Sequence, residues 1–324
     1  MSDYSFSQKL LHDLALSSDL VRQATFDIEN FFFKNDISLD AKHVFITGLA
    51  RSGTTVLLNH IFTTNEFASL TYRDMPFILA PNIWSKLNKH KDINEKERAH
   101  GDGILVSIDS PEAFEEIFWK TFSDEDQKAK FPEFVNLVLN KYSKQRYLSK
   151  NNNNHQRVLL LKKIFPESKI IIPFRDPLQH SRSLHDQHLM FKKKQANDGF
   201  VRKYMDYLGH NEFGEGYEMT HAHGIYKDFN HCNHWLEQWF LHYSKILEQL
   251  PSIKEGVVLI SYERLCDNNS VFKSLLNFIG IEDDHISCNF RLSHKENMLP
   301  YDPELLRKSL ELHKSLLQSE NCLV

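Results

Sequence analysis

The sequence predicts an α/β fold in which a P-loop-type, mainly parallel sheet is flanked by helices on both faces. Three short apolar runs, at His43–Thr47, Lys169–Phe174 and Val257–Ser261, have the composition of buried strands. Stretches with helical periodicity alternate with these runs, which is the pattern of βαβ units. A ligand of such a fold is expected outside the carboxyl ends of the strands.

The other elements follow from local patterns. Phe67–Tyr72 is predicted to be a second strand, and Gly103–Ile108 a strand or an extended connector. Ser110 and Pro111 are typical of a helix start, and Pro177 suits the first helical position after Arg175-Asp176. Further helices are predicted over Ser2–Asn35, Phe131–Tyr147, Val158–Phe165, Trp235–Leu250 and Ser270–Phe278.

We interpret the 324 residues as a single domain, because neither an internal repeat nor a clear linker is present. Residues 1–38 are predicted to be a helical cover and residues 40–285 the α/β core. Residues 191–234, rich in Gly, His, Lys and aromatic residues, are predicted to be an insertion on the acceptor side. Residues 286–324 are predicted to form a helical tail.

The bulk composition limits the possible partners and the compartment. The net charge of −4 gives no basic field that would recruit nucleic acid, and no run approaches the roughly 18 apolar residues of a membrane span. The N-terminus lacks the basic start and apolar run of a signal peptide. Four cysteines without CxxC spacing favour reduced thiols and a cytoplasmic location. The oligomeric state is left open.

The most informative segment is HVFITGLARSGTTVLLNHIF, residues 43–62. A strand, a loop from Gly48 to Gly53 and a helix in that order form an anion cradle, because loop N–H groups and the helix N-terminus point at the ligand. The lysine of a Walker-type loop is replaced by Thr54, and the cation, Arg51, lies inside the loop. A loop of this kind suits a shorter anion chain than a nucleoside triphosphate.

RSGTT after a strand resembles the 5′-phosphosulfate loop of sulfotransferases, which use 3′-phosphoadenosine 5′-phosphosulfate (PAPS) as donor and release the bisphosphate PAP. The resemblance implies that the donor's 5′ end is held by Gly48, Arg51, Ser52, Gly53, Thr54 and Thr55. It also implies that Arg51 is catalytic, because a cation here stabilises the charge that develops on the leaving phosphate oxygen.

A second segment, IIIPFRDPLQHSRS, is similar to the 3′-phosphate site of the same family. Arg175 stands at the end of a strand and Ser183 about two helical turns later. A guanidinium can grip a phosphate with two parallel bonds, and a hydroxyl can add a third. Tyr262-Glu-Arg-Leu265, followed by a helix that ends at Gly280, resembles an architectural element of sulfotransferases. The resemblance spans about residues 40–285.

The remaining catalytic candidates are weaker. Lys150 resembles a family lysine that touches the transferred group, although the following proline of that motif is missing. Asp74 is the carboxylate nearest in sequence to the position of the glutamate base of tyrosylprotein sulfotransferases. His100 is a rival, since small-molecule sulfotransferases use a histidine. Asp102, Glu115 and Glu116 also stay open as the base.

We expect no metal to be required. His221-Ala-His223 and His231-Cys-Asn-His234 could supply ligands, but 18 histidines make close pairs common by chance. The predicted reaction is sulfuryl transfer from PAPS to an acceptor hydroxyl by in-line displacement, with a carbohydrate favoured over a peptide tyrosine or a small metabolite. Two alternatives are a P-loop kinase or nucleotide hydrolase that uses Mg-ATP, with Asp176 and Thr55 on the metal, and a non-catalytic nucleotide-binding module.

Overall fold

The structure is a computed structural model that describes residues 5–35, 39–88, 95–97, 104–253, 255–282, 290–292 and 299–324. Its centre is a five-stranded sheet with the order β2-β5-β1-β6-β7, and every adjacent pair is parallel. The strands are β1 (Val44–Ile46), β2 (Phe67–Ala68), β5 (Arg146–Lys150), β6 (Lys169–Phe174) and β7 (Val257–Ser261). The predicted parallel sheet is confirmed.

The order of the strands creates a switch point at β1. After β1 the chain crosses to β2 and β5 on one side, and it then passes to β6 and β7 on the other. Connections that leave in opposite directions open a crevice at the carboxyl ends of the strands, which is where ligands bind in such sheets. The segments that follow β1, β5 and β6 therefore meet at one edge.

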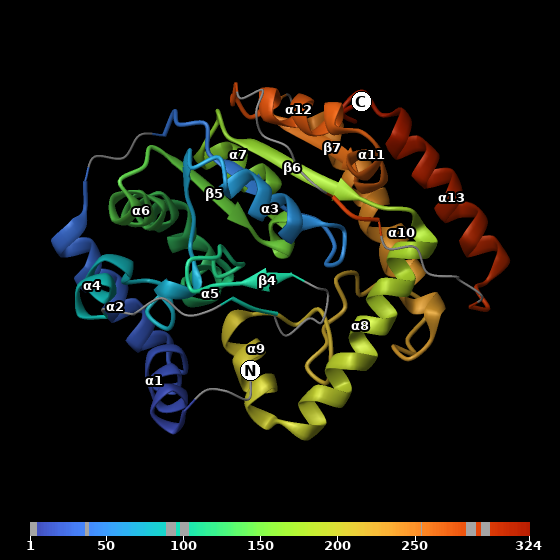
Figure 1. The fold of residues 1–324 in the computed structure, drawn as a ribbon. Helices are drawn as coiled ribbons and strands as arrows, with labels where there is room; N and C mark the ends of the chain where they lie inside the picture. The colour runs from blue at the N-terminus through green and yellow to red at the C-terminus, as the bar shows by residue number, and fades with distance from the viewer. Residues whose placement is uncertain are drawn as a thin grey trace.

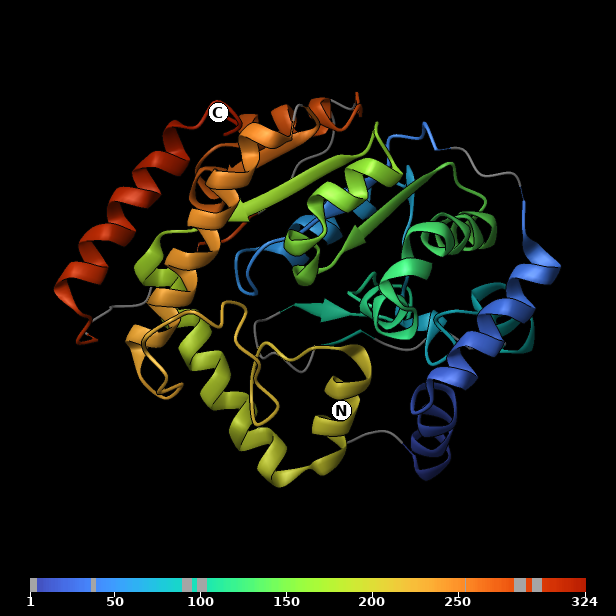
Figure 2. The same cartoon turned by 180° about the vertical axis from the view of Figure 1, so that it is seen from behind.

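Helices cover both faces of the sheet, as the sequence predicts (Figures 1 and 2). Because side chains alternate along β1, Val44 and Ile46 belong to one apolar cluster and Phe45 to the other. The first cluster includes α3 (Thr54–Phe62) and α12 (Asn269–Phe278). The second includes α6 (Asp124–Tyr142), α7 (Val158–Ile164) and α10 (Cys232–Gln249).

The remaining elements surround this centre. A second sheet pairs β3 (Lys96–Glu97) with β4 (Leu105–Val106) in antiparallel fashion. The other α-helices are α1 (Phe6–Leu16), α2 (Asp19–Phe33), α4 (Pro81–Leu87), α5 (Glu116–Thr121), α8 (Pro177–Asn197), α9 (Gly199–Leu208), α11 (Tyr262–Asp267) and α13 (Pro303–Gln318). Three short 3₁₀ helices are η1 (Tyr72–Asp74), η2 (Asn152–Gln156) and η3 (Leu250–Ser252).

Several predicted elements have different bounds. The helix predicted over 131–147 ends at Tyr142, because Ser143 takes a left-handed conformation at φ 51° and the next residues join the sheet as β5. Lys150 therefore stands at the end of a strand of the main sheet. The predicted N-terminal helix is divided into α1 and α2, and the predicted strand 67–72 is only two residues long.

The helix predicted to start at Ser110 was also wrong. Residues 108–112 run beside 70–73 and exchange backbone hydrogen bonds with them, from Tyr72 N–H to Ser110 O and from Glu112 N–H to Leu70 O. Helix α5 starts only at Glu116. The cross-strand bonds hold this segment extended and so override the local start signal.

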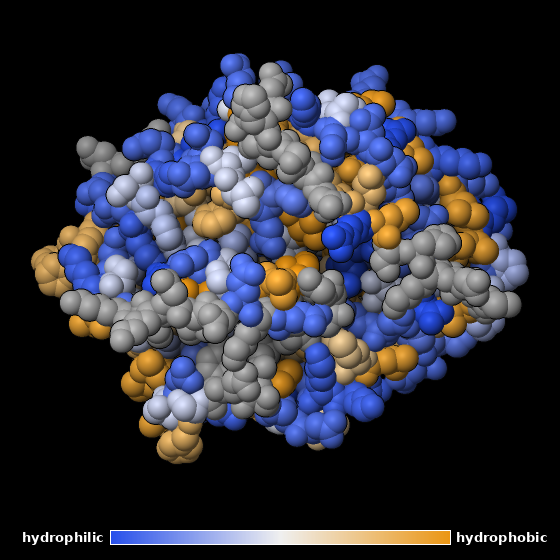
Figure 3. Space-filling model, in the orientation of Figure 1, coloured by the Kyte–Doolittle hydropathy of each residue, from blue (hydrophilic) through white to orange (hydrophobic). Residues whose placement is uncertain are grey.

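The face shown in Figure 3 carries mainly hydrophilic side chains with scattered apolar ones. Within the described ranges we find no helix with the length and apolar content needed to cross a bilayer.

Candidate active site

The loop after β1 depends on two glycines. Gly48 has φ +146°, and a Cβ built on it would lie 3.3 Å from the carbonyl oxygen of Pro173 on β6. Gly53 has φ +99°, and its Cβ would lie 2.4 Å from the ring of Tyr262. Gly53 is also the N-cap of α3 and has no side chain to cap it. The N-terminus of α3 thus begins directly at the loop, which is the position that an anion site of this kind requires.

Arg51 joins the two motifs that are far apart in sequence. Its φ of +70° is uncommon for a residue other than glycine, and such conformations are frequent at functional sites. Its Nε donates a hydrogen bond of 3.2 Å to Ser183 Oγ on α8, and its carbonyl oxygen accepts one of 3.2 Å from Arg175 Nη1. Residues 51, 175 and 183 therefore lie together at the switch point.

Arg175 is fixed in place by the segment after β7. Glu263 Oε1 lies 3.9 Å from Arg175 Nε and accepts the N–H of Asp176 at 3.0 Å, while its Oε2 accepts Ser261 Oγ–H at 3.0 Å. The Tyr262 ring centroid lies 5.4 Å from the guanidinium carbon. Arg175 Nε is buried without a hydrogen-bond partner among the described residues, so it can donate to an anion.

His180 supports the loop after β1, a role that the sequence did not suggest. It is fully buried on α8, and its Nε2–H donates to the carbonyl oxygen of Ala50 at 2.8 Å. Burial and the nearby Arg175 lower the pKa of this imidazole to about 3, so it stays neutral near pH 7. The ring holds the loop without adding a charge to the anion site.

Lys150 ends β5 beside Ile46 of β1 and is 8% exposed. Its Nζ lies 4.0 Å from Glu112 Oε1. Glu112 in turn accepts hydrogen bonds from Tyr72 OH at 3.1 Å and from Ala113 N–H at 2.9 Å. A buried ion pair thus lies at the carboxyl edge of the sheet, one strand away from the phosphate loop.

Asp74 is held by the fold. Its Oδ2 accepts the N–H of Thr71 at 2.7 Å and Tyr142 OH at 2.8 Å, and its Oδ1 pairs with Lys141. The side chain is completely buried, and it closes a capping box at the start of η1. This geometry gives Asp74 a structural role and does not favour it as a base.

Of the other candidates for the general base, the structure describes Glu115 and Glu116. Glu115 accepts hydrogen bonds from Trp119 Nε1 at 2.9 Å and Asn154 Nδ2 at 2.7 Å, and Glu116 pairs with both Nη atoms of Arg157 at 2.7 and 2.8 Å. Both carboxylates are buried in these contacts. His100 and Asp102 lie outside the described residues.

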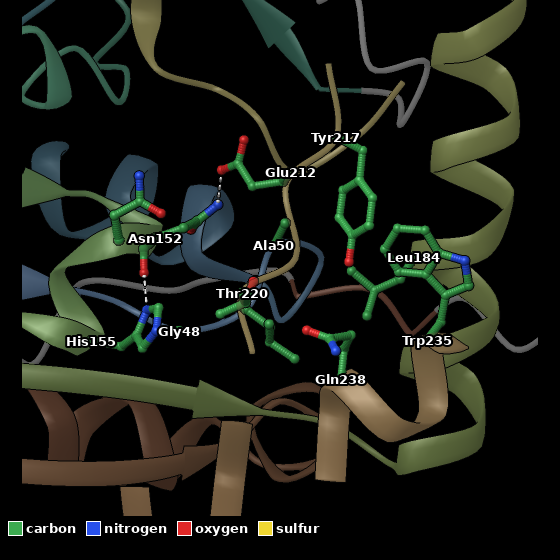
Figure 4. A pocket seen from close by; sticks show the side chains of 12 residues that line it. Gly48, Ala50, Asn152, His155, Leu184, Glu212, Tyr217, Thr220, Trp235 and Gln238 are labelled. Carbon is green, nitrogen blue, oxygen red and sulfur yellow. Dashed lines mark hydrogen bonds between the residues drawn. The ribbon is translucent and has the colours of Figure 1, made fainter. Parts of the chain in front are cut away.

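A small pocket, partly open to solvent, lies against the loop residues Gly48, Leu49 and Ala50. Asn152 links the loop to the opposite wall, as Figure 4 shows for its bond to Glu212. Its Oδ1 accepts Thr54 Oγ1–H at 3.4 Å, and its Nδ2 donates to Glu212 Oε1 at 2.9 Å. Sequence reasoning missed Asn152 and Glu212, because neither belongs to a recognisable motif.

The fold and this site define an α/β protein of the P-loop type, in which Thr54 stands where a Walker loop has its lysine and Arg51 lies inside the loop. A sequence profile of the sulfotransferase family matches residues 43–225, which is more than half of the chain. The chain therefore belongs to the sulfotransferase family, a class of enzymes that take the sulfuryl group from PAPS. The prediction from the two motifs that the chain is a sulfotransferase is confirmed.

Solved structures agree on the fold. The chain is similar to sulfotransferase STF9 from Mycobacterium avium, with a TM-score of 0.55, 11% identity, and coverage of 95% of this chain and 84% of that one. It is also similar to sulfotransferase STF1 from Mycobacterium tuberculosis, with a TM-score of 0.52, 12% identity, and coverage of 91% and 78%. No curated protein matches the sequence. The roles of the individual site residues stay predictions.

Proposed function

We propose that this enzyme transfers the sulfuryl group of PAPS to a hydroxyl of a carbohydrate. The observation that carries the donor part is the meeting of Arg51, Arg175 and Ser183 at one edge of the sheet, through two hydrogen bonds of 3.2 Å. PAPS has one anionic group at each end of its ribose. A site with one guanidinium in the phosphate loop and a second at the end of the neighbouring strand suits these two ends.

The phosphosulfate would lie against Arg51 and the backbone of residues 52–55, at the N-terminus of α3. Arg175 and Ser183 would hold the 3′-phosphate. Glu263 is a positioning residue in this scheme, because it contacts Arg175 and Asp176 and reaches no part of the loop mouth in the described contacts.

In the proposed step the acceptor oxygen forms a bond to sulfur while the bond from sulfur to the 5′-phosphate oxygen breaks. The electron pair of the broken bond stays on that phosphate oxygen, where Arg51 and Lys150 stabilise the charge. The acceptor proton passes to a carboxylate. We propose Glu212 for this role in place of Asp74, because Glu212 is half-buried in the pocket beside the loop whereas Asp74 is completely buried.

The pocket supports a carbohydrate acceptor. Tyr217 and Trp235 give it aromatic walls, and Thr220, Gln238 and Glu212 add groups that can hydrogen-bond hydroxyls. Tyr217 is the better stacking surface, because it is half-buried while Trp235 is 2% exposed. Glu212, Tyr217 and Thr220 lie in residues 191–234, which we propose as the acceptor-side insertion of a single domain. Residues 191–197 of that segment continue α8.

The test is transfer of label from sulfur-radiolabelled PAPS to a panel of glycans, tyrosine peptides and small phenols. We expect product with a glycan, and Glu212→Gln should lower kcat by about 10²–10⁴-fold while PAP affinity is unchanged. Product with phenols or peptides alone would overturn the carbohydrate assignment. Failure to bind PAP, together with magnesium-dependent turnover of ATP, would overturn the donor assignment as well.

The cytoplasmic location stays a prediction. Of the four cysteines, Cys232, Cys266 and Cys322 are free thiols in the structure.

A further inference from the structure

Three histidines from separate segments converge, and one of them, His155, lines the pocket. His155 belongs to η2, His221 to the segment between α9 and α10, and His242 to α10. Their ring centroids are 4.5 Å apart for His155 and His242, 5.6 Å for His221 and His242, and 6.0 Å for His155 and His221. One ring nitrogen of each lies within 4.8 Å of the nitrogens of the other two.

These rings leave polar atoms unpaired in a buried place. His155 Nε2, His221 Nε2 and both nitrogens of His242 have no hydrogen-bond partner within the part of the chain that the structure describes. His242 is fully buried and His155 is 5% exposed. Buried polar atoms nearly always have a partner, and one bound ion would take one nitrogen of each ring, which satisfies three of these four.

The imidazole of His155 is already oriented as that of a metal ligand would be. His155 Nδ1 donates a hydrogen bond of 2.8 Å to the carbonyl oxygen of Asn152, drawn in Figure 4, so its Nε2 carries the lone pair that faces the cluster. Metal-binding histidines usually donate their other N–H to a carbonyl or carboxylate in this way. Gln238 holds the backbone of His221 through bonds of 2.9 Å and 3.1 Å.

The charge state also suits a ligand set. Burial lowers the pKa of His155 and of His221 to about 4, and that of His242 well below its ordinary value. All three rings are therefore neutral near pH 7, and their lone pairs are available without the loss of a proton. The exposed Lys245 is close enough to lower all three pKa values, and Glu116 acts in the opposite direction on His155.

We propose that His155, His221 and His242 bind one divalent transition-metal ion, for which zinc is the best match to three imidazoles with an open fourth position. Zinc–nitrogen bonds of about 2.0–2.1 Å place tetrahedral ligand nitrogens roughly 3.4 Å apart. The ligand nitrogens now lie within 4.8 Å of one another, so the rings need to move closer together to reach this geometry.

The site would act as a clamp outside the sulfuryl-transfer chemistry. His221 lies in the acceptor-side segment, and His155 lines the pocket. The carbonyl oxygen of Asn152 accepts both His155 Nδ1–H and, at 3.1 Å, the hydroxyl of Thr47, the residue directly after β1. An ion on the three rings would therefore tie the acceptor side to the segment that supports the donor loop.

Binding is tested on the chelator-treated full chain by equilibrium dialysis against zinc chloride and by titration with cobalt(II), whose ligand-field bands report tetrahedral nitrogen coordination. We expect one ion per chain and a rise in Tm with zinc, because the ion binds only the folded state. His221→Gln should weaken binding by more than about 100-fold, since even the loss of an outer partner weakens metal sites by about 10–100-fold. The matched control is His223→Gln, two residues away and exposed, which should bind as wild type does.

His242→Phe is a second variant, and PAP binding by calorimetry confirms that each variant is folded. Equal zinc affinity in wild type and His221→Gln would overturn the proposal. So would the absence of stoichiometric binding in a wild-type protein that still binds PAP. If the wild type does not bind PAP, that result counts against the proposed donor site. The proposed metal site is then judged on the dialysis and the cobalt spectra alone.

Discussion

Replacement of Arg175 by alanine tests whether the 3′-phosphate and the 5′-phosphate of the donor are bound at separate sites. In the structure Arg175 has 10% of its side chain exposed, donates to the carbonyl oxygen of Arg51 at 3.2 Å, and keeps a buried Nε without a partner among the described residues. The guanidinium can therefore offer two N–H groups to the 3′-phosphate. Hydrogen bonds to charged groups contribute about 1.5–3 kcal/mol each.

We take about 3 kcal/mol as the net loss, because two bonds are lost while solvent screens part of the charge that remains. This corresponds to a Kd for PAP that is higher by about 10²-fold. The fold should tolerate the change, since Glu263 keeps its hydrogen bonds with Asp176 N–H and Ser261 Oγ–H. A thermal melt of the variant checks this expectation.

The assay is isothermal titration with two ligands, PAP and adenosine 5′-phosphate, which lacks the 3′-phosphate. We expect Arg175→Ala to lose affinity for PAP and to retain its affinity for adenosine 5′-phosphate. Arg202→Ala, which removes an exposed ion pair with Glu215, is the matched control and should change neither affinity. An equal loss for both ligands would refute the reasoning, because it would mean that Arg175 acts by holding the Arg51 carbonyl.

Three further changes test the supporting structure. Gly53→Ala should lower the free energy of unfolding by about 2–4 kcal/mol in urea titration, because alanine meets both the positive φ and the Tyr262 ring; an unchanged value would contradict the glycine argument. Lys141→Met should cost about 3–5 kcal/mol by leaving Asp74 buried without its cation, and adding Asp74→Asn should recover part of the loss. If Asp74→Asn alone abolishes turnover in a folded protein, Asp74 is the base after all. His180 has a pKa lowered from 6.5 to about 3, so the stability it contributes is present above pH 6.5 and is lost as the pH falls toward 3. His180→Gln should flatten this part of the stability curve measured from pH 7 to pH 4, and an identical slope would refute the assignment.

The sequence was sufficient to predict where Arg51 and Arg175 lie in the fold, because their positions are set locally. Arg51 lies in a loop bounded by two glycines, and Arg175 ends an apolar strand, so each backbone position follows from a few neighbouring residues. Parallel strands then bring the two positions to one edge of the sheet. Arg51 and Ser183 are 132 residues apart in the sequence. Their contact could still be predicted, because it follows from the order of the strands.

The strand that carries Lys150 could not be recognised in this way. Its residues, RYLSK, include only two apolar side chains and follow a strong helix pattern. Arg146 can stand in a strand because it lies at the sheet's opposite end, where its guanidinium donates to the carbonyl oxygens of Lys42 and Ile279. Tertiary pairing with β1 and β2 overrides the local preference, and it places Lys150 at the carboxyl end of a strand beside β1.

The choice of the general base also depends on tertiary packing that the sequence does not reveal. Spacing from Arg51 points to Asp74, but a carboxylate that already has Thr71, Lys141 and Tyr142 around it, and is wholly buried, has no open side for an acceptor. Glu212 lies on a long connection and is linked to Thr54 through Asn152, so its place depends on the packing of the whole acceptor side. Reactive groups carried on loops by a rigid scaffold leave little periodic signal in a sequence. The carboxylate that faces the pocket is therefore the better choice than the one with the better spacing.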